Sequence, residues 1–305
     1  MLVTPRDVFI ADFSIRSFKK LSQVLRNFNW KLQIYLNCLS EQQKDKYIKK
    51  WRQYSYVEIL DNSVYVDRNS IKPGELVTFD GISTRPFEGK YEIGCVVWER
   101  EFRKISTDYW CLVDADFEIL EADFIHYIFD TLESNSNIWV FSTDSGEKCR
   151  IYNSYCNEHI ISAKRFDTWF CVYKKDCLKC NTPLYYHEEI INSEKWVWDD
   201  TGKFQEDLQK QECCRLLSLK DVEPLSKRMQ FVYQYIHYGA FSKNISLSTK
   251  YNVAIYRFIV IMSHRGMLFM KRDSFLNKII RKLFSFMYKM KYKQLIKERK
   301  QYHFK

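Results

Sequence analysis

The order of hydrophobic and polar positions in the first part of the chain predicts alternating strands and helices. Residues 7–11 form a short apolar run typical of a strand, and the apolar side chains of residues 15–28 recur at helical spacing. Residues 31–36 have the pattern of a second strand, residues 40–54 that of a polar helix, and residues 56–60 that of a third strand. This order is typical of a parallel sheet with helices packed on it, so we expect an α/β fold.

The chain is organised around residues 109–119, in which five apolar or aromatic residues run into Asp114 and Asp116. An apolar run bounded by acids is typical of a buried strand whose carboxyl end opens into a crevice, where open α/β sheets bind ligands. Two aspartates one residue apart can point the same way and jointly hold a hard divalent cation. The alternative is a strand followed by a solvated acidic turn. Helical patterns at residues 91–105 and 121–133 flank the strand and favour ligand binding.

This stretch resembles the Asp-x-Asp motif of GT-A-fold glycosyltransferases, most closely those of family 2. In that family a helix with an early glycine, here Gly94, precedes a hydrophobic strand that ends in Asp-Ala-Asp. The resemblance follows the order of elements from Asp7 to Lys243. It implies a GT-A (Rossmann-like) mixed sheet flanked by helices, in which Asp114 and Asp116 bind Mn²⁺ or Mg²⁺. Through that ion they would bind the diphosphate of a nucleotide sugar, and a UDP-sugar is the donor that we expect first.

A second part of the resemblance lies at residues 57–63, at the end of the third predicted strand. The segment is similar to a Glu-Ile-Ile-Val-Val-Asp-Asn-Gly-Ser segment of family 2, whose aspartate hydrogen-bonds the nucleotide base. Asp61 takes that place here, and it precedes the Asp-x-Asp motif as it does in the family. An Asx turn that closes the strand is the alternative interpretation.

Acidic and aromatic residues are concentrated in residues 196–208, where four acids and two tryptophans occur. A sugar transfer that inverts the anomeric carbon needs a carboxylate to take the proton of the acceptor hydroxyl, and aromatic faces line such pockets. In the family this base is an aspartate at the start of a helix. The resemblance assigns it to Asp200, which precedes Thr-Gly like an N-cap residue, with Asp199 and Asp207 in reserve. The alternative is a capped surface helix whose acids favour the N-terminal end of its dipole.

His237 ends a further strand-like run, where a lone histidine is often a packing residue. Many GT-A enzymes, however, complete the metal site with a histidine near the C-terminus. In the retaining family 8 enzymes it belongs to a His-Phe-x-Gly-x-x-Lys motif whose lysine contacts the diphosphate. His237 and Lys243 keep the six-residue separation, although Gly239 stands one place early. The resemblance therefore implies His237 as a third metal ligand and Lys243 as a diphosphate contact, and leaves open whether the reaction inverts or retains configuration.

Positive charge is concentrated at the end of the chain. Of the net charge of +10, residues 265–305 carry +11, from thirteen Lys or Arg against two acids, and the rest of the chain carries −1. Apolar residues recur at helical spacing over residues 276–290, so we expect a basic amphipathic helix that lies on an anionic membrane surface. The alternatives are a helix packed on the catalytic domain with its basic face in water, and an arm that binds nucleic acid.

The sequence shows no secretory signal at its start, and the late apolar stretch at residues 253–262 is interrupted by Arg257 and too short to span a bilayer. We therefore expect a peripheral protein at the cytoplasmic face of the membrane, with its ten cysteines reduced. Cys177 and Cys180 have the spacing of metal ligands, but since no second such pair exists, an ordinary turn is the preferred interpretation.

Together these features predict a GT-A-like catalytic domain at residues 1–250, with a nucleotide-binding half at about 1–120, an acceptor half at about 121–250, and a helical basic extension at 251–305. The expected function is a metal-dependent glycosyltransferase that moves a sugar from a nucleotide-diphosphate sugar to a saccharide or lipid-linked saccharide. Surface polysaccharide, lipopolysaccharide or capsule synthesis of the bacterial type fits this chemistry, and no nucleic-acid partner is expected. The alternatives are a basic membrane- or nucleic-acid-binding protein without catalysis, and a phosphatase or nucleotidyltransferase that uses the Asp-x-Asp.

Overall fold

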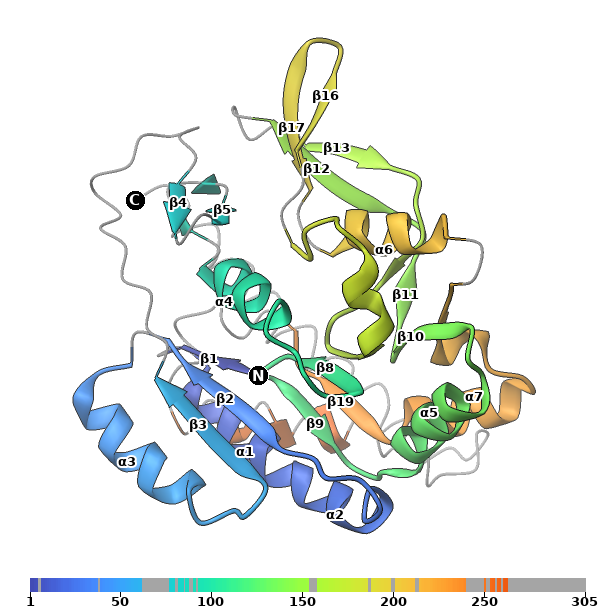
Figure 1. The fold of residues 1–305 in the computed structure, drawn as a ribbon. Coiled ribbons are helices and arrows are strands. Elements are labelled where there is room, and N and C mark those ends of the chain that lie inside the picture. Colours follow the sequence, from blue (N-terminus) through green and yellow to red (C-terminus); the bar gives the residue numbers. More distant parts are fainter. Residues whose placement is uncertain are drawn as a thin grey trace, which may run out of the picture. The chain divides into compact units, whose positions relative to one another are not determined.

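The computed structural model shows a mixed α/β protein with several helices and small sheets (Figure 1). The chain divides into two compact units, each built from segments that are far apart in the sequence. The structure describes residues 1–4, 7–37, 39–61, 77–79, 82–84, 86–87, 90–91, 93–153, 158–185, 188–198, 201–211, 214–239, 250, 253–255, 257–258 and 260–262.

The first unit comprises Met1–Ser63, Ala115–Ile125 and Met229–Lys305. The elements of its N-terminal segment are β1 (Leu2–Val3), α1 (Val8–Ser17), η1 (Phe18–Lys20), α2 (Leu21–Val24), β2 (Leu32–Leu36), α3 (Glu41–Trp51) and β3 (Val57–Asp61). The three strands form a parallel sheet in the order β1-β2-β3, in which Tyr35 pairs with Leu2 on one side and with Leu60 on the other. The parallel βαβαβ arrangement predicted from the sequence is therefore present.

The strand expected at residues 7–11 is wrong, because α1 begins at Val8 and the first strand is Leu2–Val3. The buried side chains of α1 include Val8, Ala11 and Ile15, which recur every three to four residues. The helical stripe that starts at Ile15 in the prediction thus begins seven residues earlier. A short apolar run does not distinguish a strand from a buried helix by its periodicity, which explains the error.

Helix α3 begins where the sequence pattern predicts it. Ser40 is its N-cap: Ser40 Oγ accepts a hydrogen bond from Gln43 N at 3.2 Å, and Gln43 Oε1 accepts one from Ser40 N at 3.1 Å. This reciprocal pair satisfies two backbone N–H groups at the helix end. On the other side of α3, Tyr47 and Trp51 are buried, and Trp51 Nε1 donates to Asp12 Oδ1 at 3.1 Å. The last contact packs α3 against α1.

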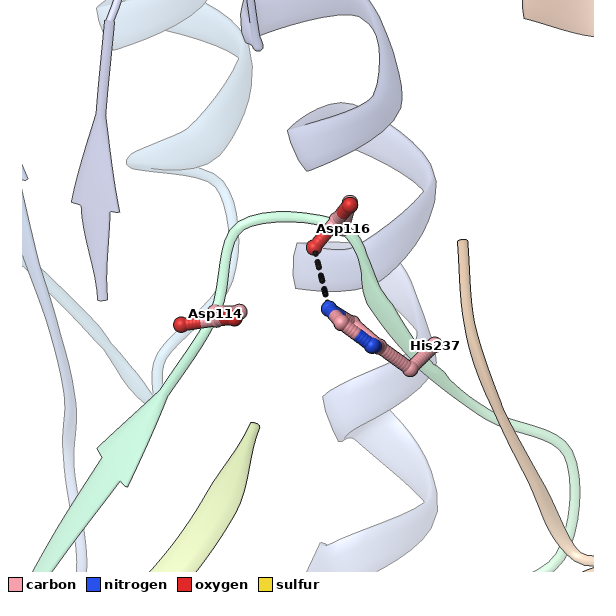
Figure 2. Close-up of side chains that lie close together, drawn as sticks. All are labelled: Asp114, Asp116 and His237. Atoms are coloured by element: carbon pink, nitrogen blue, oxygen red, sulfur yellow. Dashed lines mark ion pairs between the residues drawn. The ribbon is translucent and has the colours of Figure 1, made fainter. Parts of the chain in front are cut away.

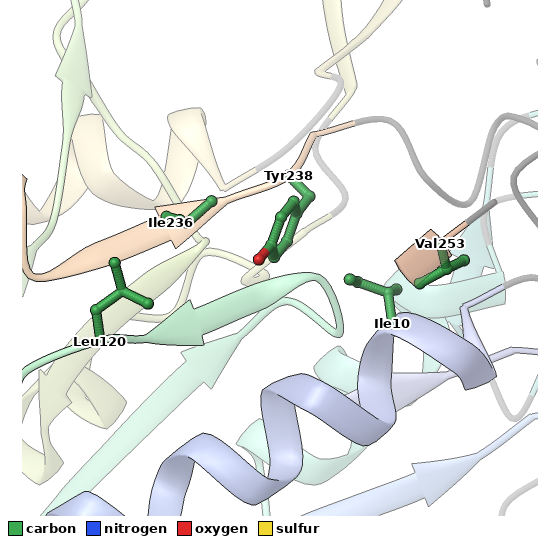
Figure 3. Close-up of a cluster of buried hydrophobic side chains, with 5 residues drawn as sticks. All are labelled: Ile10, Leu120, Ile236, Tyr238 and Val253. Carbon is green, nitrogen blue, oxygen red and sulfur yellow. The ribbon is translucent and has the colours of Figure 1, made fainter. Parts of the chain in front are cut away.

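The first unit also contains a two-stranded antiparallel pair, β9 (Phe117–Ile119) and β19 (Tyr235–His237). Two serines of α1 bind β9: Ser14 Oγ donates to Phe117 O, and Ile119 N donates to Ser17 Oγ at 3.0 Å. Figure 3 shows the apolar cluster that packs α1 against this pair, which consists of Ile10, Leu120, Ile236, Tyr238 and Val253.

The second unit comprises Val64–Asp114 and His126–Arg228. The strands of its two larger sheets are β8 (Tyr109–Val113), β10 (Ile138–Ser142), β12 (Cys149–Asn153), β13 (Glu158–Ile161), β15 (Phe170–Lys174), β16 (Glu188–Ile191), β17 (Glu194–Trp198) and β18 (Arg215–Ser218). One sheet has the order β18-β10-β15-β8, and the other has the order β13-β12-β17-β16. In the first of these, β10 runs parallel to β18 and antiparallel to β15, and β15 runs antiparallel to β8.

The helices and short strands in the remainder of the chain complete the description. They are β4 (Val77–Phe79), β5 (Ile82–Thr84), β6 (Pro86–Phe87), β7 (Lys90–Tyr91), α4 (Ile93–Phe102), α5 (Asp123–Ser134), β11 (Ser145–Gly146), β14 (Arg165–Phe166), η3 (Lys175–Lys179), α6 (Gly202–Gln209), η4 (Leu219–Asp221) and α7 (Leu225–Val232). The helices predicted at residues 91–105 and 121–133 correspond to α4 and α5, so both are confirmed. Among the described residues, the strands belong to separate small sheets, and β8 lies at an edge of its sheet.

The structure bears on the membrane question only for the described part of the chain. There, none of the helices is both long enough and apolar enough to cross a bilayer. The basic amphipathic helix predicted near the C-terminus falls in residues 263–305, which lie outside the described residues.

Candidate metal-binding site

The Asp-x-Asp motif lies in the turn that connects β8 to β9. The apolar strand β8 ends at Val113, and Asp114 N donates to Trp169 O at 3.1 Å. Two residues later, Asp116 O accepts a hydrogen bond from Tyr238 N at 3.0 Å. The backbone of the turn is therefore bonded on both sides of Ala115. The predicted strand is present and leads into the two carboxylates. Only Leu112 and Val113 of β8 are buried, and the strand lies at the edge of its sheet, so the expected burial is confirmed only for its last two residues.

His237 approaches this turn from β19. Figure 2 shows its imidazole beside the carboxylate of Asp116, with His237 Nε2 at 3.2 Å from Asp116 Oδ1. The side chains of Asp116 and His237 are 12% and 15% exposed. One ligand atom from each of Asp114, Asp116 and His237 lies within 4.8 Å of the other two. Among the described residues, this is the group of three acid, histidine or cysteine side chains with the geometry of a metal site.

The register of the β9–β19 pair determines where His237 lies. His237 is opposite Phe117, Ile236 is opposite Glu118, and Tyr235 is opposite Ile119. Because successive side chains of a strand point to opposite faces, a shift of one residue would turn the imidazole away from Asp116. The stacked rings of Phe117 and Tyr235, with centroids 5.2 Å apart, favour the observed register.

A buried carboxylate supports the site from β9. Glu118 Oε2 accepts hydrogen bonds from the Tyr238 hydroxyl and from Arg257 Nε, both at 2.7 Å, and Arg257 Nη2 contacts the other carboxylate oxygen. Burial alone would lower the pKa of Arg257, but the contacts with Glu118 outweigh it and raise the pKa above its usual value. This network joins Tyr238, the residue after His237, to β9, the strand that follows Asp116.

The sequence indicates only part of this supporting network. Glu118 continues the alternation of Asp114 and Asp116, which is a weak signal that it belongs to the same region. Tyr238 and Arg257 were not predicted as its partners, because Arg257 stands 139 residues from Glu118 and in the sequence only interrupts an apolar run.

Asp61, the predicted contact for the nucleotide base, is the last residue of β3. Its side chain is 48% exposed, and its Oδ2 lies 2.7 Å from Lys44 Nζ. The hydrogen bonds to Asp61 and then to Glu41 raise the pKa of Lys44 above its usual value. Asp61 is thus accessible to a ligand, and a base that binds it would share the carboxylate with Lys44.

The predicted catalytic acids differ in what the structure describes. Asp199 and Asp200, like the predicted diphosphate contact Lys243, lie outside the described residues. The helix that follows Asp199 and Asp200, α6, has Thr201 as its N-cap and begins at Gly202.

Asp207, the reserve candidate, lies on α6 among cations. Its carboxylate accepts a hydrogen bond from Thr182 Oγ1 at 2.7 Å and lies 3.2 Å from Lys210 Nζ and 3.4 Å from Lys203 Nζ. Burial by itself raises the pKa of Asp207, but these contacts outweigh it, and the pKa lies below its ordinary value. A carboxylate with a lowered pKa is a weaker base, so this environment does not favour Asp207 as the proton acceptor.

Comparisons of the chain with protein-family models, with curated proteins and with solved structures gave no match. The functional argument therefore depends on the chemistry of the site.

Proposed function

We propose that the chain is a metal-dependent glycosyltransferase of the GT-A type, which moves a sugar from a nucleotide-diphosphate sugar to an acceptor hydroxyl. The observation that carries this proposal is the group of Asp114, Asp116 and His237, whose ligand atoms lie within 4.8 Å of one another. Two carboxylates just after β8 and an imidazole at the end of β19 can hold a divalent ion that also touches a diphosphate. The parallel strands β1, β2 and β3, which precede the motif in the chain, support the GT-A assignment, since the resemblance implies strands of this kind in the nucleotide-binding half.

The donor set fits an ion of the Mn²⁺ type. Carboxylate oxygens suit both Mg²⁺ and Mn²⁺, whereas an imidazole nitrogen is a ligand of transition metals, and Mg²⁺ keeps mostly oxygen ligands. The two carboxylates also supply two negative charges against the two positive charges of the ion. Because the side chains of Asp116 and His237 are mostly buried, the interaction is screened less by water than on an open surface. We expect Mn²⁺ first and Mg²⁺ second.

A bound ion would neutralise charge on the diphosphate leaving group. Three contacts within the first unit hold two of the residues that would bind this ion, Asp116 and His237. The β9–β19 pairing holds His237 beside Asp116, and the bond from Tyr238 N to Asp116 O holds the turn. Glu118 ties Tyr238 to the same strand. Asp116 and His237 are thus held beside each other before an ion binds, which limits the reorganisation that binding requires of these two residues.

The remaining roles in this proposal follow the resemblance. Asp200 would take the proton of the acceptor hydroxyl if the reaction inverts configuration, with Asp199 as its neighbour and Asp207 disfavoured by its lowered pKa. Asp61 would contact the base of the donor and Lys243 its diphosphate. The excess of basic residues in residues 265–305 would attract the enzyme to an anionic membrane, which favours a saccharide or lipid-linked saccharide acceptor.

A basic binding protein without catalysis is less well supported. It would account for the charge of residues 265–305 but not for two carboxylates and a histidine gathered at the end of β8. A phosphatase or nucleotidyltransferase would use the same two aspartates. These enzyme classes are therefore distinguished from a glycosyltransferase by the substrate that the protein turns over.

Asp116→Ala tests the proposal. Mn²⁺ binding to the full-length protein is measured by isothermal titration calorimetry, and UDP-, GDP-, CMP- and TDP-sugars are screened for metal-dependent thermal stabilisation and turnover. We expect D116A to weaken Mn²⁺ binding by more than the roughly 10–100-fold that loss of an outer-shell partner costs, and to abolish donor turnover. Asp45→Ala is the matched control, because Asp45 is an exposed aspartate of α3.

Two outcomes would contradict different parts of the proposal. Undiminished Mn²⁺ binding in D116A would refute the metal site. Mn²⁺ binding that depends on Asp116 without stabilisation or turnover by any nucleotide sugar would refute glycosyl transfer and leave the metal site standing.

A further inference from the structure

The first unit contains a pocket of about 470 Å³ beside α1 and β9, which we name the basic pocket. Its volume falls in the range of about 300–1,000 Å³ that is typical of small-molecule sites. Its lining includes Phe13 and Arg16 of α1, Lys19 and Lys20 of η1, Glu118 of β9, and Arg257 from a helical segment later in the chain.

Four basic side chains line the basic pocket. The guanidinium carbons of Arg16 and Arg257 lie 4.8 and 4.5 Å from the centroid of the same ring, that of Phe13. Because both distances end at one ring, the two charges are separated by less than the Debye length of about 10 Å at 0.1 M salt and repel each other. Lys19 and Lys20 line the same pocket. An anion between these side chains would relieve the repulsion.

The protein holds two of the basic side chains in place. Arg257 Nε donates to Glu118 Oε2 at 2.7 Å, and its Nη2 contacts the second carboxylate oxygen. Lys20 Nζ donates to Ile119 O at 2.6 Å. Groups that are already ordered lose less conformational entropy when a ligand binds, so this part of the basic pocket is prepared for an anion.

Among the described residues, the neighbouring carboxylates do not balance the positive charge of the basic pocket. Asp12 pairs with Arg16 at 3.3 Å and also with Lys50 at 2.6 Å, so one carboxylate serves two cations. Asp12 and Glu118 together supply two negative charges. The four basic side chains of the basic pocket and Lys50 supply five positive charges, which leaves an excess of three positive charges. A phosphate ester carries close to two negative charges near neutral pH, and its oxygens match the N–H fork of arginine.

We propose that the basic pocket binds the phosphate group of a phosphorylated small molecule or of a lipid headgroup. The basic side chains supply the charge, and the volume leaves room for the group that carries the phosphate. The ring of Phe13 gives that group an apolar surface to contact. Because Asp114, Asp116 and His237 are not among the lining residues, this proposal does not depend on glycosyl transfer.

Inorganic pyrophosphate in metal-depleted, low-salt buffer tests the proposal, with binding to the full-length protein measured by isothermal titration calorimetry. Lys19→Glu reverses an exposed charge at the basic pocket, and Lys49→Glu makes the same change at an exposed position of α3. We expect K19E to weaken pyrophosphate binding at least about tenfold and K49E less than about twofold, because Coulomb energy falls with distance. Equal weakening in both variants, or no binding to the unaltered protein, would overturn the proposal.

A second variant separates the basic pocket from the metal site. Asp116→Ala should keep full pyrophosphate affinity in metal-depleted buffer, and loss of binding there would overturn the proposal. Two further probes identify the source of the phosphate. If K19E lowers binding to vesicles of phosphatidic acid in phosphatidylcholine and K49E does not, the ligand is a lipid headgroup. If K19E lowers only the affinity for glucose 1-phosphate, the ligand is a soluble phosphate ester.

Discussion

Replacing Tyr238 with phenylalanine should destabilise the first unit by a predictable amount. The Tyr238 hydroxyl donates to Glu118 Oε2 at 2.7 Å, and both residues are 4% exposed. A hydrogen bond to a charged group contributes about 1.5–3 kcal/mol to stability. Phenylalanine keeps the ring in the apolar cluster of Figure 3, so the change removes the hydroxyl alone. We therefore expect the free energy of unfolding to fall by about 2 kcal/mol.

The same substitution should weaken Mn²⁺ binding. Tyr238 follows His237 directly, and Glu118 stands two residues after Asp116, so their hydrogen bond links the two strands that carry these proposed ligands. Loss of an outer-shell partner of this kind lowers metal affinity roughly 10–100-fold. The effect on binding is thus expected even though neither Tyr238 nor Glu118 is a proposed ligand.

Urea denaturation followed by tryptophan fluorescence measures the stability of Tyr238→Phe, and calorimetry measures its Mn²⁺ affinity. Tyr54→Phe is the control, because Tyr54 is half-buried and its ring stacks on Tyr56 at 5.4 Å, a contact that phenylalanine retains. Unchanged stability and unchanged Mn²⁺ affinity in Y238F would refute the reasoning. Lost stability with full affinity would show that the Glu118 network supports the fold and not the site.

Three further predictions concern the acids of the acceptor side and the end of the chain. Asp200→Asn should leave nucleotide-sugar binding intact and lower transfer, and an unchanged turnover number would mean that the base lies elsewhere or that the reaction retains configuration. Asp207→Asn should lower the urea midpoint more at pH 7 than at pH 3. Because the folded pKa of Asp207 is lowered, its stabilising effect is fully present above the unfolded value of about 3.9 and is lost as the pH falls through the folded pKa. An equal loss at both pH values would contradict this. Removal of residues 265–305 should release the protein from phosphatidylglycerol vesicles at moderate salt, and continued co-sedimentation would refute membrane binding by this segment.

The elements that could be predicted from the sequence are those with a strong local signal. Helix α3 has a capping box at Ser40 and Gln43, and β2 and β3 are short apolar runs on either side of it. The Asp-x-Asp motif follows from the apolar run of β8, which is also a local feature. By contrast, the apolar run at residues 7–11 predicts a strand where α1 begins, because the run is too short to carry a reliable period.

The arrangement of the site could be predicted only in part, because its contacts join residues that are far apart in the sequence. The resemblance to family 8 indicates His237, but its contact with Asp116 joins residues on either side of the segment His126–Arg228 and depends on the register of β9 and β19. In the sequence, Arg257 only interrupts an apolar stretch. Its role as the partner of Glu118 requires the fold, since local patterns do not specify which cation pairs with a buried carboxylate.

The backbone hydrogen bonds of the turn between β8 and β9 allow the effect of the two aspartates on metal binding to be measured separately from their effect on folding. Asp114 N is bonded to Trp169 O and Asp116 O to Tyr238 N, so these bonds use the backbone of both aspartates and neither carboxylate. A change from Asp to Asn preserves both backbone bonds and nearly the same side-chain volume, and removes the negative charge. Asp114→Asn and Asp116→Asn should therefore fold as the unaltered chain does, because backbone bonds of this kind do not depend on the charge of the side chain. A loss of Mn²⁺ affinity in these variants would then reflect the missing ligand charge, whereas a comparable loss of folding would mean that the carboxylates serve the structure of the turn.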